Sequence, residues 1–405
     1  MTTDSGAAAS TEASWTPAQV RALFPALPDL TWLNAAASSP LCTPVAEAME
    51  RVITASRERG DLDFPRWLAQ RDAVRERLAR FVGTTADTVA FTPSTSFGFH
   101  VVAQCLKARG HTEVLTLEHE FPSTTVPLLH AGLTVRGVRR RPDGSYPLAD
   151  LEAALRPSTK AIAVSVVQFN SGYRVDLAGL SRLCRDRGLV LCLNGAQAIG
   201  HVPLDVTAAG ASFLAMPSHK WLGAGYGTGM LVVAREFHDV LPMAGWLSVP
   251  SELLWQAFPG VTRVDDAAGF VASAPTTRRD ASALEGGGAS WVGWHGLEAA
   301  LEVHERVGGE TTLAHVQALQ VQLRAGLRAR GFVPNAPDDA SMSSGICVVP
   351  VSGAAEDVVR ALLREAKVVT TPRGGGVRLS THVFNTAEDV DRALWAFDRL
   401  GVRPA

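Results

Sequence analysis

Lysine is scarce in this sequence of 405 residues: of its 38 basic residues, 34 are arginines and four are lysines. With 40 acidic residues the formal net charge is −2, which leaves no basic field for a nucleic acid. We therefore expect no nucleic-acid partner. The hydrophobic share of 46% is enough for a large core, and the length suggests two or three domains.

Paired cysteines and long apolar runs are also missing. The five cysteines are odd in number, widely spaced and contain no Cys-x-x-Cys, which excludes a disulfide framework and an ordinary zinc site and fits a reducing cytoplasm. Uncharged stretches such as 188–204 are broken by Asn, Gln, Gly and Pro, so none is typical of a membrane span. The N-terminus has no signal peptide pattern. We expect a soluble cytoplasmic protein with no metal and no membrane partner.

Short apolar runs alternate with amphipathic stretches from about 30 to 234, and the runs that predict strands are 88–92, 113–117, 133–138, 161–167, 189–194, 212–216 and 228–233. Amphipathic stretches at 96–107, 126–130 and 177–187 predict helices. This alternation predicts an α/β fold, with a mostly parallel sheet of the seven-stranded type and helices on both faces. In such sheets ligands bind at the carboxyl ends of the strands.

The C-terminal third has a different pattern. A long helical stretch at 294–330 precedes predicted strands at 346–351, 368–371 and 377–380, with helices at 355–365 and from Thr386. This pattern predicts a smaller α+β domain. The expected division is a disordered tail (1–14), an N-terminal segment that packs with the small domain (15–60), a large domain (61–290) and a small C-terminal domain (291–405).

Lys220 is the candidate nucleophile. It lies in Ser218-His219-Lys220-Trp221-Leu222, after a predicted strand and before glycines at every second position. That glycine spacing fits neither a dinucleotide fingerprint nor a phosphate loop. A lysine at the edge of a sheet can form a Schiff base with a carbonyl compound, although a lone lysine is more often a surface residue in a turn. The other three lysines lie near helix ends or before a strand.

Three motifs in order carry a family resemblance: Asn194-Gly195-Ala196-Gln197-Ala198-Ile199-Gly200, Ser218-His219-Lys220-Trp221-Leu222 and Val377-Arg378-Leu379-Ser380. From about Trp32 to Leu400 the chain resembles the class V aminotransferase family of pyridoxal-phosphate enzymes, which have fold type I and include cysteine desulfurases, kynureninase and isopenicillin N epimerase. The resemblance implies pyridoxal 5'-phosphate as the cofactor, Lys220 as its Schiff-base and proton-shuttling residue, and a homodimer.

The resemblance also implies a phosphate site. Thr92-Pro93-Ser94-Thr95-Ser96 ends one predicted strand and opens a helix, whose N-terminus favours an anion. An ordinary helix cap is the simpler interpretation of this segment alone. In the family the matching residues, Thr95 and Ser96, bind the cofactor phosphate, and Ser218 and His219 match a second set of phosphate ligands.

Four further positions match residues around the cofactor ring. Phe121 would stack on the ring, Gln197 would bind its phenolic oxygen, and either Gln168 or Asn170 would approach that oxygen. Asn194 stands where the family has an aspartate that keeps the ring nitrogen protonated. A neutral amide only donates or accepts hydrogen bonds, so it does not hold that proton by charge. Asn194 could alternatively be only the cap of a following helix.

On the substrate side, Arg378 matches the arginine that binds the carboxylate of an α-amino acid, and Asn34 matches a stretch that lines the substrate pocket. Arg373 is a second candidate. The loop 370–376 lacks the nucleophilic cysteine of cysteine desulfurases. Gly288 stands where relatives reach the partner's phosphate site with a threonine.

Three functions fit these residues. The first is a lyase or epimerase that acts on an α-amino acid, with β-elimination at a carbon–sulfur bond as one form. The second is an aminotransferase or a decarboxylating enzyme with the same cofactor. The third is a catalytically degenerate cofactor-binding protein. Lys220 argues against the third, and Asn194 argues against the second.

Overall fold

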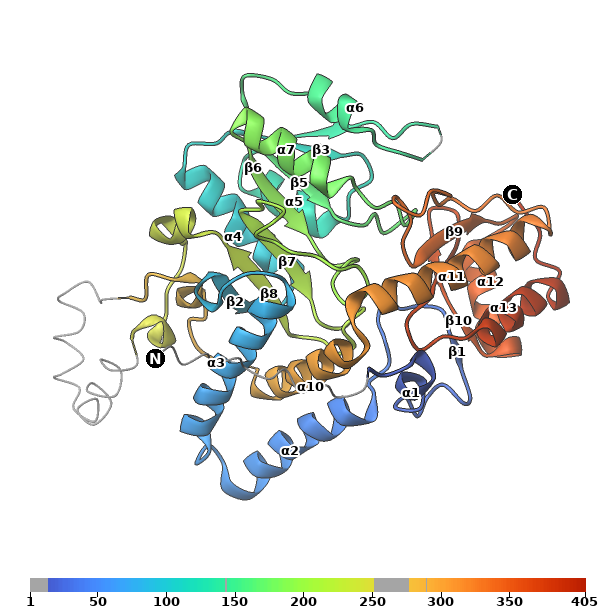
Figure 1. The fold of residues 1–405 in the computed structure, drawn as a ribbon, viewed down its shortest axis with the longest axis horizontal. Coiled ribbons are helices and arrows are strands. Elements are labelled where there is room, and N and C mark those ends of the chain that lie inside the picture. Colours follow the sequence, from blue (N-terminus) through green and yellow to red (C-terminus); the bar gives the residue numbers. More distant parts are fainter. Residues whose placement is uncertain (1–13, 143, 251–276, 289) are drawn as a thin grey trace, which may run out of the picture.

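The structure is a computed structural model that describes residues 14–142, 144–250, 277–288 and 290–405. Except for Ser14, the predicted disordered tail lies outside these residues. The central sheet has seven strands in the order β2-β8-β7-β6-β5-β3-β4 (Figure 1). The strands are β2 (Val89–Thr92), β3 (Glu113–Leu117), β4 (Thr134–Val138), β5 (Thr159–Ser165), β6 (Val190–Asn194), β7 (Phe213–Pro217) and β8 (Gly229–Val233). Only β8 runs antiparallel to its neighbours, β7 and β2. The predicted α/β fold is confirmed.

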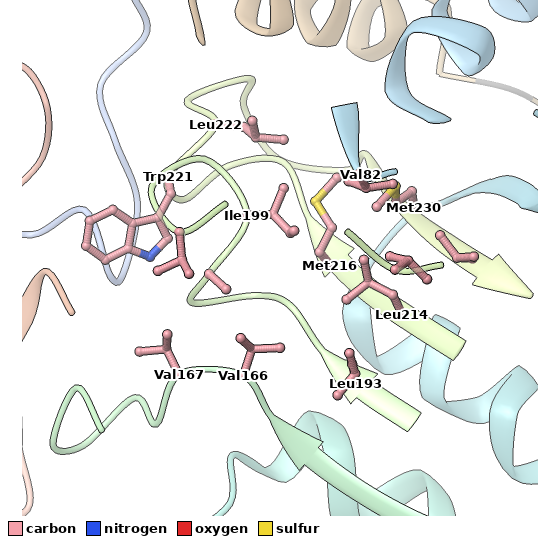
Figure 2. Packing of buried hydrophobic residues seen from close by; sticks show 14 of the residues in the cluster. Val82, Val166, Val167, Leu193, Ile199, Leu214, Met216, Trp221, Leu222 and Met230 are labelled. Carbon is pink, nitrogen blue, oxygen red and sulfur yellow. The ribbon is translucent and has the colours of Figure 1, made fainter. Parts of the chain in front are cut away.

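Alternating side chains of the strands bury opposite faces of this sheet. In β6, Leu191 and Leu193 pack in one hydrophobic cluster, and Cys192 packs in another. The first cluster contains residues of α7 (Leu177–Arg187), and the second contains residues of α4 (Thr95–Ala108) and α5 (Pro122–His130). Figure 2 shows part of the first cluster, with Leu193 on the sheet and Trp221 just beyond it. Because both faces are covered, the inner strands are mostly apolar and buried, whereas the edge strand β4 is partly exposed and carries Thr134 and Arg136.

The N-terminal segment connects both parts of the molecule. After α1 (Pro17–Arg21), strand β1 (Thr31–Trp32) pairs in parallel with β10 (Val368–Val369) of the C-terminal part. The chain then forms α2 (Thr43–Arg59) and α3 (Phe64–Phe81), which pack against α10 (Trp291–Val307) (Figure 1). The buried apolar side chains of α10 belong to the first hydrophobic cluster, which also contains Leu191 and Leu193 of β6. The predicted domain limits stay a prediction.

The predicted helical stretch at 294–330 is helical in the structure, but it consists of two helices. α10 ends at Val307, its cap residue Gly308 has a φ of 86° that favours glycine, and α11 (Gly309–Arg328) follows. The small sheet has the order β11-β12-β9 and its own hydrophobic core. Its part of the chain contains β9 (Ile346–Pro350), α12 (Ala355–Ala366), β10, β11 (Thr371–Arg373), β12 (Gly376–Ser380) and α13 (Ala387–Arg399).

The remaining elements are short. They are α6 (Leu148–Ala153) and the 3-10 helices η1 (Ala86–Thr88), η2 (Arg235–Val240), η3 (Trp246–Ser248) and η4 (Ala281–Leu284). Among the described residues, no helix is long and apolar enough to cross a membrane.

Candidate active site

The carboxyl ends of β6 and β7 bring two of the predicted site residues to one edge of the sheet. Asn194 is the last residue of β6, and Lys220 follows β7 by three residues. These strands are parallel neighbours, in which Asn194 is the partner of Ala215. The third predicted group, Arg378, comes from β12 of the small sheet.

The Lys220 amine lies in a half-buried, electropositive position. Its Nζ is 5.3 Å from the centre of the Phe121 ring. Burial, and then the positive charges of Arg378 and Arg373, lower the pKa of Lys220 to about 7. A large fraction of this amine is therefore uncharged at neutral pH, which is the nucleophilic form.

Phe121 precedes the first turn of α5 and makes an edge contact with Phe169, with ring centres 5.1 Å apart. The Phe121 ring thus lies near Lys220 and is held by its edge contact with Phe169. Its predicted stacking on the cofactor stays a prediction.

The side-chain amide of Asn194 has a fixed orientation. The N–H of Ala196 donates to Asn194 Oδ1 at 2.9 Å, and Asn194 Nδ2 donates to Thr124 Oγ1 at 2.8 Å and lies 3.4 Å from Ser123 Oγ. Because a backbone N–H only donates, the oxygen must face it and the NH₂ group must face the hydroxyls. No helix follows Asn194, since residues 196–201 form turns, so the helix-cap interpretation is wrong.

Gln197 connects three parts of the site. Its Nε2 donates to the carbonyl of Ala36, and its Oε1 accepts from the indole of Trp221, both at 2.9 Å. Gln168 and Asn170 each have a buried side-chain carbonyl oxygen without a hydrogen-bond partner. Both of these remain candidates for the approach to the cofactor.

The predicted phosphate ligands lie around the start of α4. Ser94 is the helix cap and accepts from the N–H of Phe97. Thr95 is buried and Ser96 is exposed, and both lie in the first helical turn. Thr92 Oγ1, two residues before this helix cap, is buried without a hydrogen-bond partner. A helix N-terminus with unpaired donors suits a phosphate group.

The second set of predicted phosphate ligands, Ser218 and His219, already has partners within the chain. Ser218 Oγ donates to the carbonyls of Thr228 (2.7 Å) and Gly225 (2.9 Å), so its hydroxyl hydrogen holds the glycine loop. His219 stacks on Tyr226 with ring centres 4.1 Å apart. Burial, and then Lys220, lower the pKa of His219 to about 4, so its ring is neutral at pH 7 and still carries one N–H donor.

Gly288 lies beside this region. It lines a cavity of about 660 Å³ together with Thr92, Gly227 and Trp294. A Cβ placed at Gly288 would meet no atom within 4 Å, so the backbone at this position is open to the cavity.

Arg378 is an unsatisfied buried cation. The residue is 2% exposed, its Nη1 donates to the carbonyl of Phe169 at 3.3 Å, and its Nε and Nη2 have no partner. Burial, and then Arg373, lower the pKa of Arg378 to about 9. A buried charge without a counter-charge is costly, so this group is suited to receive an anion. Asn34 lies close by, where it bridges to Ser380 and accepts a hydrogen bond from Thr371.

The buried carboxylate of Glu120 could not be predicted from the sequence. It is buried and accepts from the N–H of Ser165 (2.7 Å), from Ser165 Oγ (2.5 Å) and from Gln168 Nε2 (2.7 Å). Burial raises its pKa. The sequence around Glu120 does not show its burial, because its hydrogen-bond partners Ser165 and Gln168 are distant in the sequence. Only the neighbouring Phe121 marked this segment as part of the site.

A stack of rings next to Lys220 was also missed. Trp221 lies between His201 and His382, with ring centres 3.7 Å and 5.8 Å away. His382 Nε2 also lies 2.8 Å from the carbonyl oxygen of Trp221. These contacts fix the backbone directly after Lys220.

All five cysteines are buried and free. Cys347 lies in β9 opposite Leu379, and burial raises its pKa to about 12. Its thiol is therefore protonated and enclosed, which does not suit nucleophilic chemistry.

Comparison with known proteins identifies the class of the chain. The aminotransferase class-V family model matches residues 31–393, so the chain belongs to this family, whose cofactor is pyridoxal phosphate. The predicted family and cofactor are confirmed.

Individual relatives cover nearly the whole chain. An uncharacterized aminotransferase of Bacillus subtilis is 27% identical over 93% of this chain and 96% of its own length. The isopenicillin N epimerase of Amycolatopsis lactamdurans is 26% identical over 92% and 96%. The solved structure of a cysteine desulfurase from Thermococcus onnurineus has a TM-score of 0.84 at 23% identity and covers 96% of this chain and 99% of its own.

Proposed function

We propose that this chain is a pyridoxal-phosphate-dependent lyase or epimerase that acts on an α-amino acid. The observation that carries the proposal is Asn194, a neutral amide whose NH₂ group, and not its oxygen, faces the hydroxyls of Ser123 and Thr124 in the first turn of α5. Relatives with isopenicillin N epimerase and cysteine desulfurase names support an enzyme of this range.

The residues present fit the cofactor. Lys220 would carry it covalently, and the N-terminus of α4, with Thr95, Ser96 and the nearby unpaired hydroxyl of Thr92, would bind its phosphate. In this proposal Ser218 and His219 complete the phosphate site, Phe121 covers one ring face, and Gln197 and Asn194 contact the ring edge. When bound, pyridoxal phosphate withdraws electrons from the bonds at the α carbon of the substrate.

The chain's own residues would then perform two tasks. Arg378 binds the α-carboxylate through its two unpaired nitrogens and so fixes the α carbon. Lys220, with a pKa of about 7, is able to accept the α proton and to return it at neutral pH. Because Lys220 lies on one face only, epimerisation would also need a second acid to deliver a proton to the opposite face, whereas departure of a group from the β carbon would give elimination.

Asn194 favours these outcomes over transamination. A carboxylate at this position would hold a proton on the ring nitrogen, whereas the neutral amide of Asn194 has no charge to hold it. One of its two N–H hydrogens is donated to Thr124 at 2.8 Å, and the other, whose contact with Ser123 Oγ is long at 3.4 Å, is the one that would donate to an unprotonated nitrogen. Asn194 would therefore leave the bound cofactor a weaker electron acceptor than an aspartate would, which would favour elimination or epimerisation over transamination. The hairpin 371–378 holds no cysteine, so persulfide formation on this loop is not proposed.

The test is a panel of amino acids incubated with the holoenzyme. We expect pyruvate and ammonia, with sulfide from sulfur-substituted substrates, or else inversion with deuterium uptake at the α carbon. Asn194→Asp is the matched variant, since it changes charge and not size, and it should accumulate more pyridoxamine phosphate. A wild-type enzyme that builds up pyridoxamine phosphate and turns over with keto acids would contradict the proposal.

We also propose a cytoplasmic homodimer. Its support is the resemblance to relatives that complete the phosphate site from a partner chain, and the position of Gly288 at a cavity beside Thr92. Sedimentation velocity measures this state.

A further inference from the structure

Two arginines project from the same face of one hairpin. In the antiparallel pair of β11 and β12, Thr371 is opposite Arg378, and Arg373 is opposite Gly376. Opposed residues share a face, and so do residues two positions apart in one strand. Thr371, Arg373 and Arg378 therefore point to one side, which is the side where Thr371 binds Asn34.

Both guanidinium groups act on the active-site lysine, because both positive charges lower the pKa of Lys220. Each of the two has a buried Nε without a hydrogen-bond partner. Within the described ranges no carboxylate forms an ion pair with either of them, and Arg373 is the charged group that most affects the pKa of Arg378. Two adjacent cations without an anion repel each other.

The two arginines differ in depth. Arg378 is 2% exposed, whereas Arg373 is half-buried and adjoins the exposed turn at Gly374 and Gly375. A substrate held by its α-carboxylate at Arg378 would extend its side chain outward, past Arg373. A single carboxylate neutralises only one of these two charges, and a second anionic group neutralises the other.

We propose that the substrate is a dianionic amino acid, with its α-carboxylate on Arg378 and a second carboxylate-like group of its side chain on Arg373. This inference rests on the proposed function and adds its substrate class. Arg373 is then a specificity-determining residue, which discriminates by charge against amino acids with a neutral side chain.

The experiment measures binding and does not depend on turnover. Calorimetric titration of the holoenzyme with glutarate and with butyrate compares a dicarboxylate with a monocarboxylate of similar length. We expect glutarate to bind about tenfold more tightly, the effect of one additional charge-assisted contact. Arg373→Gln should remove this advantage and change butyrate binding by less than about twofold. Arg373→Lys should keep part of it. Arg364→Gln, at an exposed residue of α12, is the control.

Two results would overturn the inference. Equal weakening of both ligands by Arg373→Gln would show that the two arginines share one carboxylate. An unchanged preference would show that Arg373 does not contact the ligand. Both results leave the reaction class open, and a transaminating enzyme that still prefers glutarate would contradict the proposed function alone.

Discussion

At the scale of single residues, the site is built from groups whose charge states depend on their neighbours. The amine of Lys220 lies near the ring of Phe121, and both burial and the positive charges of Arg378 and Arg373 disfavour its charged form. Arg378 is unsatisfied without an anion. The environment of Lys220 thus favours its neutral, nucleophilic form, and the environment of Arg378 favours the binding of an anion.

Cofactor attachment should follow the protonation of Lys220. Below its pKa of about 7 the amine is protonated and unreactive, so the rate of attachment to the apoenzyme should rise with pH and level off above about 7. Arg378→Gln removes a positive neighbour, stabilises the protonated amine and should move this midpoint upward. Stopped-flow absorbance measures the rate, with Lys107→Ala as the control. A midpoint near that of an ordinary lysine in the unmodified protein would contradict this account.

At the scale of elements, a buried ion pair holds the segment before α10 against α3. Arg75 forms a two-pronged contact with Glu285, which also accepts from the N–H of Phe91 in β2, and Arg71 lies 3.8 Å from the same carboxylate. The segment that contains Gly288 therefore starts from a fixed point beside the sheet.

Removal of this carboxylate should be costly. Glu285→Ala leaves Arg75 and Arg71 buried without their counter-charge, and the free energy of unfolding should fall by about 3–5 kcal/mol. The control Glu58→Ala breaks an exposed pair with Arg57 and should cost less than about 1 kcal/mol. Urea unfolding followed by circular dichroism measures both. A similar small effect of the two substitutions would show that the buried pair is not an anchor.

At the scale of the whole molecule, three buried imidazoles connect its parts. His201 follows β6, His304 lies in α10, and His382 follows β12. Burial is the main cause that lowers the pKa of each of them, to about 4 for His304 and to about 3 for His382. The folded state therefore favours the uncharged form of these three imidazole rings.

Acid should therefore destabilise the fold in a defined window. Unfolded histidines bind protons near pH 6.5, and the folded ones bind them only near pH 4 or below, so the unfolded state takes up more protons between these values. Stability should fall as the pH falls from about 6.5 to about 4, by up to roughly 1.4 kcal/mol per pH unit for each ring. His382→Gln should reduce the slope of melting temperature against pH, with His100→Gln, an exposed residue of α4, as the control. An unchanged slope would contradict this role.

Much of the site was predictable because its signals are local. Lys220 follows an apolar strand and precedes a glycine loop, and the buried strands on either side are continuous apolar runs. Both features depend on neighbours in the sequence. The break between α10 and α11 at Gly308 was missed, because a helical pattern continues on both sides of that glycine.

The amino-acid sequence by itself determined the sheet and the position of the candidate lysine, because hydrophobic periodicity is a property of neighbouring residues. The family and its cofactor followed from the resemblance of three ordered motifs to a known family. Only the tertiary structure decided the orientation of the Asn194 amide, the burial of Glu120 and the shared face of Arg373 and Arg378. Each of these depends on strand register or on a contact between segments far apart in the chain. The energies of burial and of charge pairing act only after the chain has folded, and they set which donor, acceptor or charge the site presents.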